Sequence, residues 1–401
     1  MTDGTGRGEV LDLLVIGGGV MGLFTAYQAS RTQARVAVVE TGEIGDPMTA
    51  SFGRTRSYRR DYLEAGYTRF ADEAIRLWTE FETATGADVL VRCGCMNIAS
   101  TSITPDLDNT YATLSTTVLK KMGIPVTSYD TAGIAAEYPY LQADLGDLDP
   151  VGGLVDLRTV TRTLQKSLED AGVTVHERTS TTKITRTTRT NPTTPTSSTD
   201  ELVTVTTSAG TFTTRSLVIT AGHGTNDVLA LLPGNQLRVP ITKDRPSEAK
   251  YFTPPPATRH LYTSDRMPVM AYLDTGIYLH PIVEGVIDAV KIGFYNPPDM
   301  PRGTTSINSV GDFVEQCMPG LLEAESVPVT DVDGCDYDLV ADDDFVLGAV
   351  PGFGNVFVGV GWRGTGYKYA PWVGRVLAEL SCQEGTVYDV ARFAPSRFVT
   401  A

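Results

Sequence analysis

The sequence predicts a two-domain fold that combines an α/β nucleotide-binding unit with an antiparallel β-sheet. Three observations predict it. A short apolar run at residues 11–16 leads directly into the glycine-rich stretch 17–22. Similar short apolar runs return late in the chain, at 216–221 and 355–359. Between them, residues 236–330 contain short alternating strands separated by prolines, a pattern typical of antiparallel sheet.

The first element is a βαβ unit of about 30 residues. A continuous apolar run that ends at glycines indicates a buried parallel strand over 11–16. We expect a helix from the glycines to about Ser30 and a second buried strand over 35–40.

The next elements are helices, which apolar residues at helical spacing predict over 67–82 and from Val160 to Gly172. Gly172 suits the left-handed conformation that ends a helix, and a third parallel strand is expected from Val173. The threonine-rich stretch 179–214 predicts a β-hairpin with a mobile tip at 191–199.

The last part of the chain returns to the nucleotide-binding unit, with a strand at 355–359, a glycine-rich turn and a helix at 371–380. In the middle, 276–281 and 286–294 are the clearest strands. We therefore expect a discontinuous nucleotide-binding domain and a substrate domain. The first would comprise residues 8–90, 150–235 and 330–395, and the second residues 91–149 and 236–329.

Charge and composition exclude several classes of function. The chain has 33 basic and 48 acidic residues, a net charge of −15, which argues against binding to nucleic acid or to an anionic membrane surface. No apolar stretch reaches the ~18 residues of a membrane span. Five sparse cysteines fit a reduced cytoplasm. Cys93 and Cys95 lack the partners of a zinc site, so no metal is expected.

Gly17, Gly19 and Gly22 follow a strand and open a helix, which is the context that a dinucleotide-binding motif requires. The three glycines permit, in order, a tight turn, close approach to a pyrophosphate, and close packing of strand and helix. The helix N-terminus offers N–H groups to the phosphates. Glu40 ends the second strand, where an acid can hold ribose hydroxyls. The motif does not separate FAD from NAD.

Three further stretches carry a family resemblance: SFGRTRSYR (51–59), GCDY (334–337) and GVGWRGTGYK (359–368). Through them the chain resembles the monomeric sarcosine oxidase and N-methyltryptophan oxidase family of FAD amine oxidases, nearly end to end. The resemblance implies a glutathione-reductase-like FAD-binding domain of the βαβ Rossmann type with an antiparallel-sheet substrate domain. It also implies a monomer.

The resemblance assigns roles to cationic residues. Arg56 would lie against the flavin, and Arg59 would bind the substrate carboxylate bidentately, with Lys368 as a second cation. Without the resemblance, four arginines between residues 54 and 60 would indicate a solvated face. Lys291 matches the family lysine at which oxygen reacts, although a lysine on the solvent side of a sheet is the alternative.

The resemblance also assigns the cofactor contacts. Cys335 would be joined through its sulfur to the 8α-methyl group of FAD. Other contacts would come from Met21, Ala221, Gly222, Gly361, Gly364 and Gly366.

The substrate pocket departs from the family. Phe52 stands where sarcosine oxidases have a histidine, and Leu279 and Tyr295 replace a tyrosine and a histidine that line the pocket. His280 and Tyr278 are alternative sources of polarity there. Phe52 and Trp362 favour a cyclic or aromatic amino acid over sarcosine.

The resemblance therefore implies an FAD-dependent oxidase that converts the C–N bond of an amino or imino acid to an imine and reduces O₂ to hydrogen peroxide. Three alternatives remain: a flavin dehydrogenase with another electron acceptor, an NAD(P)-dependent reductase, and a non-catalytic flavoprotein. Flavin absorbance, its bleaching by an amine, and peroxide formation distinguish them.

Overall fold

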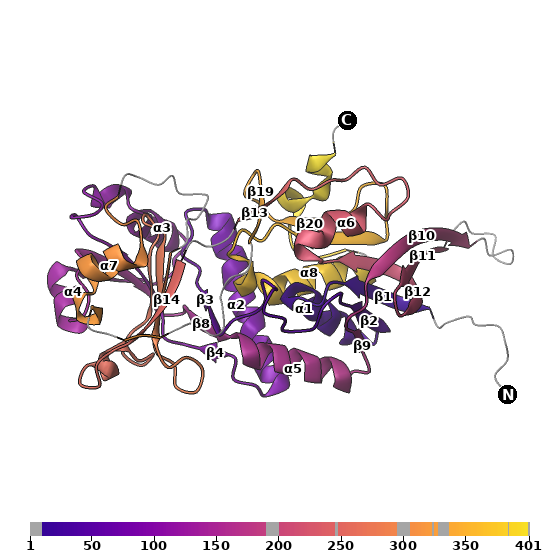
Figure 1. The fold of residues 1–401 in the computed structure, drawn as a ribbon. Coiled ribbons are helices and arrows are strands. Elements are labelled where there is room, and N and C mark those ends of the chain that lie inside the picture. Colours follow the sequence, from indigo (N-terminus) through magenta and orange to yellow (C-terminus); the bar gives the residue numbers. More distant parts are fainter. Residues whose placement is uncertain are drawn as a thin grey trace. The chain divides into compact units, whose positions relative to one another are not determined.

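The computed structural model describes residues 10–189, 200–244, 248–294, 305–322, 325–327, 337–383 and 385–399. The chain divides into two compact units. The first comprises residues 1–51, 161–244 and 337–401, and the second residues 52–160 and 245–336. Figure 1 shows the fold and labels many of its helices and strands.

The first unit is built on a mixed sheet whose parallel strands follow the order β21-β12-β1-β2-β9. These strands are β1 (Leu11–Ile16), β2 (Val36–Val39), β9 (Thr174–His176), β12 (Gly210–Ile219) and β21 (Val356–Val360). β2 and β21 consist of apolar residues and glycine, and so does β1 from Leu13 onward, as strands covered on both faces require.

Antiparallel strands extend this sheet. The hairpin β10 (Thr181–Arg189) and β11 (Asp200–Thr207) adds to the first half of β12, and β20 (Val346–Ala349) adds to β21. The hairpin confirms the prediction from the threonine-rich stretch, while its expected tip at 191–199 lies outside the described residues. A separate pair joins β13 (Ile241–Asp244) to β19 (Tyr337–Val340).

Two helices of the first unit, α1 (Val20–Ser30) and α8 (Ala370–Cys382), pack against each other and against the central strands (Figure 1). The remaining helices are α5 (Leu157–Asp170), whose first turn belongs to the second unit, and α6 (Thr225–Leu229). Gly172 follows α5 at φ +74°, as the sequence predicted.

The main sheet of the second unit has eight strands in the order β18-β14-β17-β16-β15-β5-β7-β6. Its strands are β5 (Cys95–Ala99), β6 (Thr127–Asp130), β7 (Leu145–Asp149), β14 (Glu248–Thr253), β15 (Val269–Tyr272), β16 (Ile277–His280), β17 (Val290–Phe294) and β18 (Glu325–Val327). The pairing is antiparallel except between β15 and β5, which are parallel, so the sheet is mixed.

The second unit also has a small sheet in which β3 (Thr55–Tyr58) and β4 (Leu90–Val91) both pair with β8 (Gly153–Asp156). Its helices are α2 (Ala65–Thr85), α3 (Tyr111–Lys121), α4 (Thr131–Glu137) and α7 (Val310–Cys317).

Among the described residues, three ranges differ from the expected domains: 52–90, 150–160 and 236–244. Residues 52–90 and 150–160 belong to the second unit, because β3 and β4 pair with β8 and not with the sheet that contains β1. Residues 236–244 belong to the first unit, because β13 pairs with β19.

The strand expected at 286–294 begins only at Val290. The preceding residues form a turn in which the N–H of Ile287 donates to the carbonyl of Val283 at 2.9 Å and Gly285 has φ +76°. The apolar run therefore includes a reversal of the chain before the strand.

In the part of the chain that the structure describes, no helix is long and apolar enough to cross a membrane. The described cysteines Cys93, Cys95, Cys317 and Cys382 are free thiols. Within the same ranges, no group of three or more His, Cys, Asp or Glu side chains is placed to hold a metal ion.

Candidate functional site

The glycine motif of the first unit forms a tight junction between β1 and α1. Gly17 has φ +111°, and a Cβ there would lie 2.4 Å from the carbonyl oxygen of Thr220. A Cβ on Gly22 would lie 1.9 Å from the carbonyl oxygen of Gly17. Ala221 follows β12 and has its Cα 3.0 Å from the same Cβ position of Gly17, so the turns after β1 and β12 meet here. Side chains at Gly17 or Gly22 would force β1, β12 and α1 apart.

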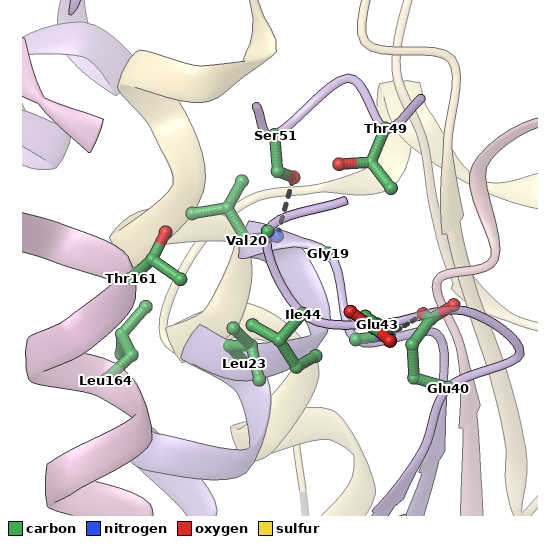
Figure 2. A pocket seen from close by; sticks show the side chains of 12 residues that line it. Gly19, Val20, Leu23, Glu40, Glu43, Ile44, Thr49, Ser51, Thr161 and Leu164 are labelled. Atoms are coloured by element: carbon green, nitrogen blue, oxygen red, sulfur yellow. Dashed lines mark hydrogen bonds between the residues drawn. The ribbon is translucent and has the colours of Figure 1, made fainter. Parts of the chain in front are cut away.

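A pocket opens at the start of α1 (Figure 2). Ser51 Oγ accepts the Val20 N–H at 2.9 Å, and a Cβ on Gly19 would meet only this hydroxyl, at 3.2 Å. The backbone of Gly19 is thus open to a ligand at a helix N-terminus, which favours an anion. The pocket is lined by Gly18, Gly19, Val20, Leu23, Glu40, Glu43, Ile44, Gly45, Thr49, Ser51, Thr161 and Leu164.

Glu40 lies in this pocket at the end of β2. Its Oε2 accepts the Gly18 N–H at 2.6 Å, and its Oε1 accepts the Gly42 N–H at 2.7 Å. These bonds fix the carboxylate beside the glycine turn, where an acid suits the hydroxyls of an unphosphorylated ribose. A second acid in the pocket, Glu43, was not anticipated from the sequence. The turn, the start of α1 and Glu40 together fit a dinucleotide.

The second glycine-rich segment of the first unit follows β21 and is held by a buried acid. Asp338 on β19 accepts the N–H groups of Gly361, at 2.9 Å, and Trp362, at 3.2 Å. Burial raises the pKa of Asp338, and these N–H bonds oppose the rise. Gly361 and Gly364 have φ of +83° and +66°, so the turn depends on left-handed residues. No local pattern in the sequence indicates this role for Asp338.

The two glycine-rich segments of this unit meet at Met21. A Cβ on Gly366 would lie 3.2 Å from Met21 Cε and 2.4 Å from Trp362 Cβ. Lys368 lies in the 3₁₀ turn Gly366–Tyr369 and is buried. The half-buried Trp362 ring packs edge-on against Phe345, with 5.4 Å between ring centroids. Gly222 follows β12 with φ +52°.

In the second unit, the arginines of residues 54–60 lie in different environments. Arg56 donates to the carbonyls of Thr55, at 3.1 Å, and Phe52, at 2.9 Å, so its guanidinium folds back over its own segment. Arg60 binds both oxygens of Asp149 at 2.7 and 3.1 Å and Asp72 at 2.7 Å. All three guanidinium nitrogens of Arg60 are used in this way, so we assign it a structural role.

Arg59 has a different environment. It is 7% exposed, and its Nη1 donates to Asp61 Oδ2 at 3.0 Å, to the Asp61 carbonyl at 2.5 Å and to Tyr111 Oη at 3.2 Å. Burial alone would lower the pKa of Arg59, but Asp61, Tyr111, Tyr62 and Cys95 together outweigh it, and the pKa is raised well above its ordinary value. Arg59 therefore stays charged, and no described hydrogen bond uses its Nε or Nη2.

Lys291 lies on β17 and is 1% exposed, which rules out the alternative of a solvent-facing lysine. It stands opposite His280 on β16, and its Nζ lies 5.5 Å from the ring centroid of Tyr278. His280 Nδ1 is 2.8 Å from Thr55 Oγ1, which connects this face of the sheet to β3.

Leu279 does not lie on the same face as Lys291. It pairs with Ile292, and both are completely buried in the apolar core of the second unit. Because side chains alternate across a strand, Tyr278 and His280 share the face of Lys291 and Leu279 points to the other. Leu279 and Lys291 therefore lie on opposite faces of the sheet, and contact of Leu279 with the substrate stays a prediction. Tyr295 and Cys335 lie outside the described residues.

Comparison with known proteins identifies the family. The model of the family described as FAD dependent oxidoreductase (DAO) matches residues 12–380. The chain is 27% identical over 406 residues to a peroxisomal sarcosine oxidase of Homo sapiens, which covers 97% of each chain. It is 24% identical over 408 residues to an N-methyl-L-tryptophan oxidase of Yersinia pestis (strain Pestoides F), covering 96% of this chain and 99% of the relative.

The fold is similar to that of a solved L-proline dehydrogenase from P. horikoshii, with a TM-score of 0.77 and 18% sequence identity over 97% of this chain and 98% of the other. The match to the family model extends from β1 to α8 and so includes both glycine-rich segments, Arg59 and Lys291. The chain belongs to the FAD-dependent oxidoreductase family.

Proposed function

We propose that this protein is an FAD-dependent oxidase of an amino or imino acid. A CH–NH group would lose two electrons and two protons to become C=N, and O₂ would take them up to become hydrogen peroxide. FAD, when bound, supplies the ring system that accepts a hydride equivalent and reacts with oxygen. The amine must be neutral, because a protonated amine has no lone pair to support the departure of hydride.

The observation that carries the proposal is the environment of Arg59. A buried, charged guanidinium that has one nitrogen held by Asp61 and two nitrogens outside every described hydrogen bond suits a carboxylate ligand. The resemblance supports Lys368 as a further carboxylate-binding cation. The names of the two relatives, together with Phe52 and Trp362, support a secondary amino acid or one with a cyclic or aromatic side chain.

The proposal is tested by mixing the protein without air with a panel of amino and imino acids and then admitting oxygen. Bleaching of the flavin absorbance by one of them, followed by stoichiometric peroxide, is the expected result. Bleaching without peroxide would identify a dehydrogenase with another acceptor. A flavin that no amine bleaches would contradict the proposed function.

Arg59→Lys is expected to weaken binding of the acid form of the substrate and to spare the amide form. Lysine keeps a positive charge beside Asp61 but loses the planar fork, so about 1.5–3 kcal/mol is lost, or roughly 10- to 150-fold in binding. Bleaching rates are measured against concentration for both forms. Arg76→Met removes an exposed arginine of α2 and serves as the control. Equal losses for the acid and the amide would show that Arg59 does not bind the carboxylate.

We also propose that FAD is attached through Cys335, which the GCDY resemblance supports. Acid precipitation of the protein should leave the yellow colour in the pellet, and Cys335→Ala should release it to the supernatant. Cys382→Ala removes another free thiol and should leave the colour in the pellet. Release of free flavin from the unaltered protein would contradict the attachment.

A further inference from the structure

Asp61 and Arg59 form a buried pair inside the second unit. Asp61 is 2% exposed, and it offers both its carbonyl and its carboxylate Oδ2 to the same arginine nitrogen, Nη1. Tyr111 on α3 completes this arrangement, because its hydroxyl accepts from Nη1 at 3.2 Å and donates to the Asp61 carbonyl at 3.0 Å. Three acceptors thus converge on one end of the guanidinium.

Aromatic rings fix the plane of the same guanidinium. The Arg59 Cζ lies 4.6 Å from the ring centroid of Tyr62 and 5.6 Å from that of Tyr111. A guanidinium held at Nη1 and against two rings has little freedom left. Its Nε and Nη2 form the remaining edge, whose two parallel N–H groups match a carboxylate.

Asp61 is itself held from β5. The side-chain amide of Asn97 donates to Asp61 Oδ2 and also lies 3.5 Å from Ser115 Oγ on α3. Asp61 Oδ1 and Asn97 Oδ1 are buried without a hydrogen-bond partner among the described residues. A carboxylate oxygen left in this state destabilises the fold, so its presence needs an explanation. A role of Asp61 in holding Arg59 in one orientation explains why this buried carboxylate is present.

We propose that Asp61 is a positioning residue for the substrate: with Asn97 and Tyr111 it holds Nη1 of Arg59, so that the substrate carboxylate binds only the Nε–Nη2 edge. This inference rests on the proposed function. Binding on one defined edge fixes the direction of the bond from the carboxylate to the α-carbon. A displacement of about 1 Å at the reacting carbon can slow chemistry by roughly 10²-fold.

The pair also changes the charge of the site. Asp61 balances the positive charge of Arg59, so recognition of the carboxylate depends on two aligned hydrogen bonds more than on net charge. Asp61→Asn keeps the shape and an acceptor oxygen while removing the negative charge. The released Arg59 should still bind a small carboxylate, but it should no longer orient a substrate.

The test measures binding and rate separately in the holoenzyme. Acetate titration reports binding at Arg59 through the flavin spectrum, and anaerobic bleaching at saturating substrate reports the limiting rate. For Asp61→Asn we expect acetate affinity within about threefold of the parent and a limiting rate at least roughly 10-fold lower. Tyr111→Phe should show the same separation with a smaller loss of rate.

The matched control is Asp72→Asn, an acid-to-amide change at the partner of the neighbouring Arg60. The side chain of Asp72 is 55% exposed, and such pairs contribute little, so both measurements should match those of the parent. If Asp61→Asn fails to fold, Tyr111→Phe decides. If the folded variants have the same limiting rate as the parent, the positioning role of Asp61 is overturned, but the proposed function is not. A parent that no amino or imino acid bleaches overturns the proposed function and this inference with it.

Discussion

Exchanging Lys291 for methionine is expected to slow the recolouring of the protein by oxygen by roughly 10²- to 10³-fold. Bleaching by substrate without air should stay near the rate of the parent. A fixed cation stabilises the negative charge that develops when oxygen receives an electron, whereas the loss of a hydride from substrate gains little from it. Stopped-flow absorbance measures the two half-reactions separately.

The environment of Lys291 supports this expectation. Its side chain is 1% exposed and lies on the face of β17 shared with Tyr278 and His280. Methionine has nearly the same length and no charge, so it can fill the space without leaving a cavity. The control is Lys166→Met, which removes an exposed lysine paired with Asp170. If bleaching collapses in Lys291→Met and recolouring is unchanged, Lys291 belongs to substrate binding, and the proposal loses the residue that favours oxygen as the electron acceptor.

Local sequence signals predicted most of the first unit. Each of these signals lies within a few consecutive residues: the apolar runs of β1, β2 and β21, and the spacing of Gly17, Gly19 and Gly22. Short runs with such end signals need no knowledge of distant partners. The domain bounds did require knowledge of distant partners, because the assignment of 52–90 depends on the pairing of β3 and β4 with β8.

The surroundings of Arg59 could not be derived in the same way. Asp61 lies two residues away, but its carboxylate is informative only together with Asn97 on β5 and Tyr111 on α3. These residues come from three segments that only the tertiary fold brings together. An acid two residues from a predicted anion-binding arginine was the local signal available in the sequence. The role of Asp338 could not be predicted either, because the turn that it holds begins 23 residues later in the sequence.

The face on which a strand residue lies could not be predicted from the sequence. One residue of displacement along a strand moves a side chain to the opposite face, and the pairing partners that fix the register are distant in the sequence. The register of β16 with β17 assigns Tyr278 and His280 to the face of Lys291. The resemblance could therefore place this strand, whereas the face of each residue follows from the pairing of β16 with β17.

Gly22→Ala is expected to remove most bound FAD and to lower the thermal midpoint of the protein. The added Cβ would lie 1.9 Å from the carbonyl oxygen of Gly17 and 2.7 Å from Thr220 Oγ1. The nearer atom belongs to the backbone and cannot rotate away, so α1 must move from β1, at a cost of about 1–3 kcal/mol. That movement displaces the N-terminus of α1 from the pocket that Gly19 and Glu40 line.

Gly354→Ala is the matched control, because a Cβ at Gly354 would meet no heavy atom within 4 Å. It removes one glycine from the same unit and should keep the parent's flavin content and thermal midpoint. Flavin content is measured from the ratio of visible to ultraviolet absorbance of the purified proteins, and the midpoint by calorimetry. If Gly22→Ala retained the same flavin content as Gly354→Ala, close packing of α1 on β1 would not be required for FAD binding. The assignment of the pocket at Gly19 and Glu40 to the dinucleotide would then fail.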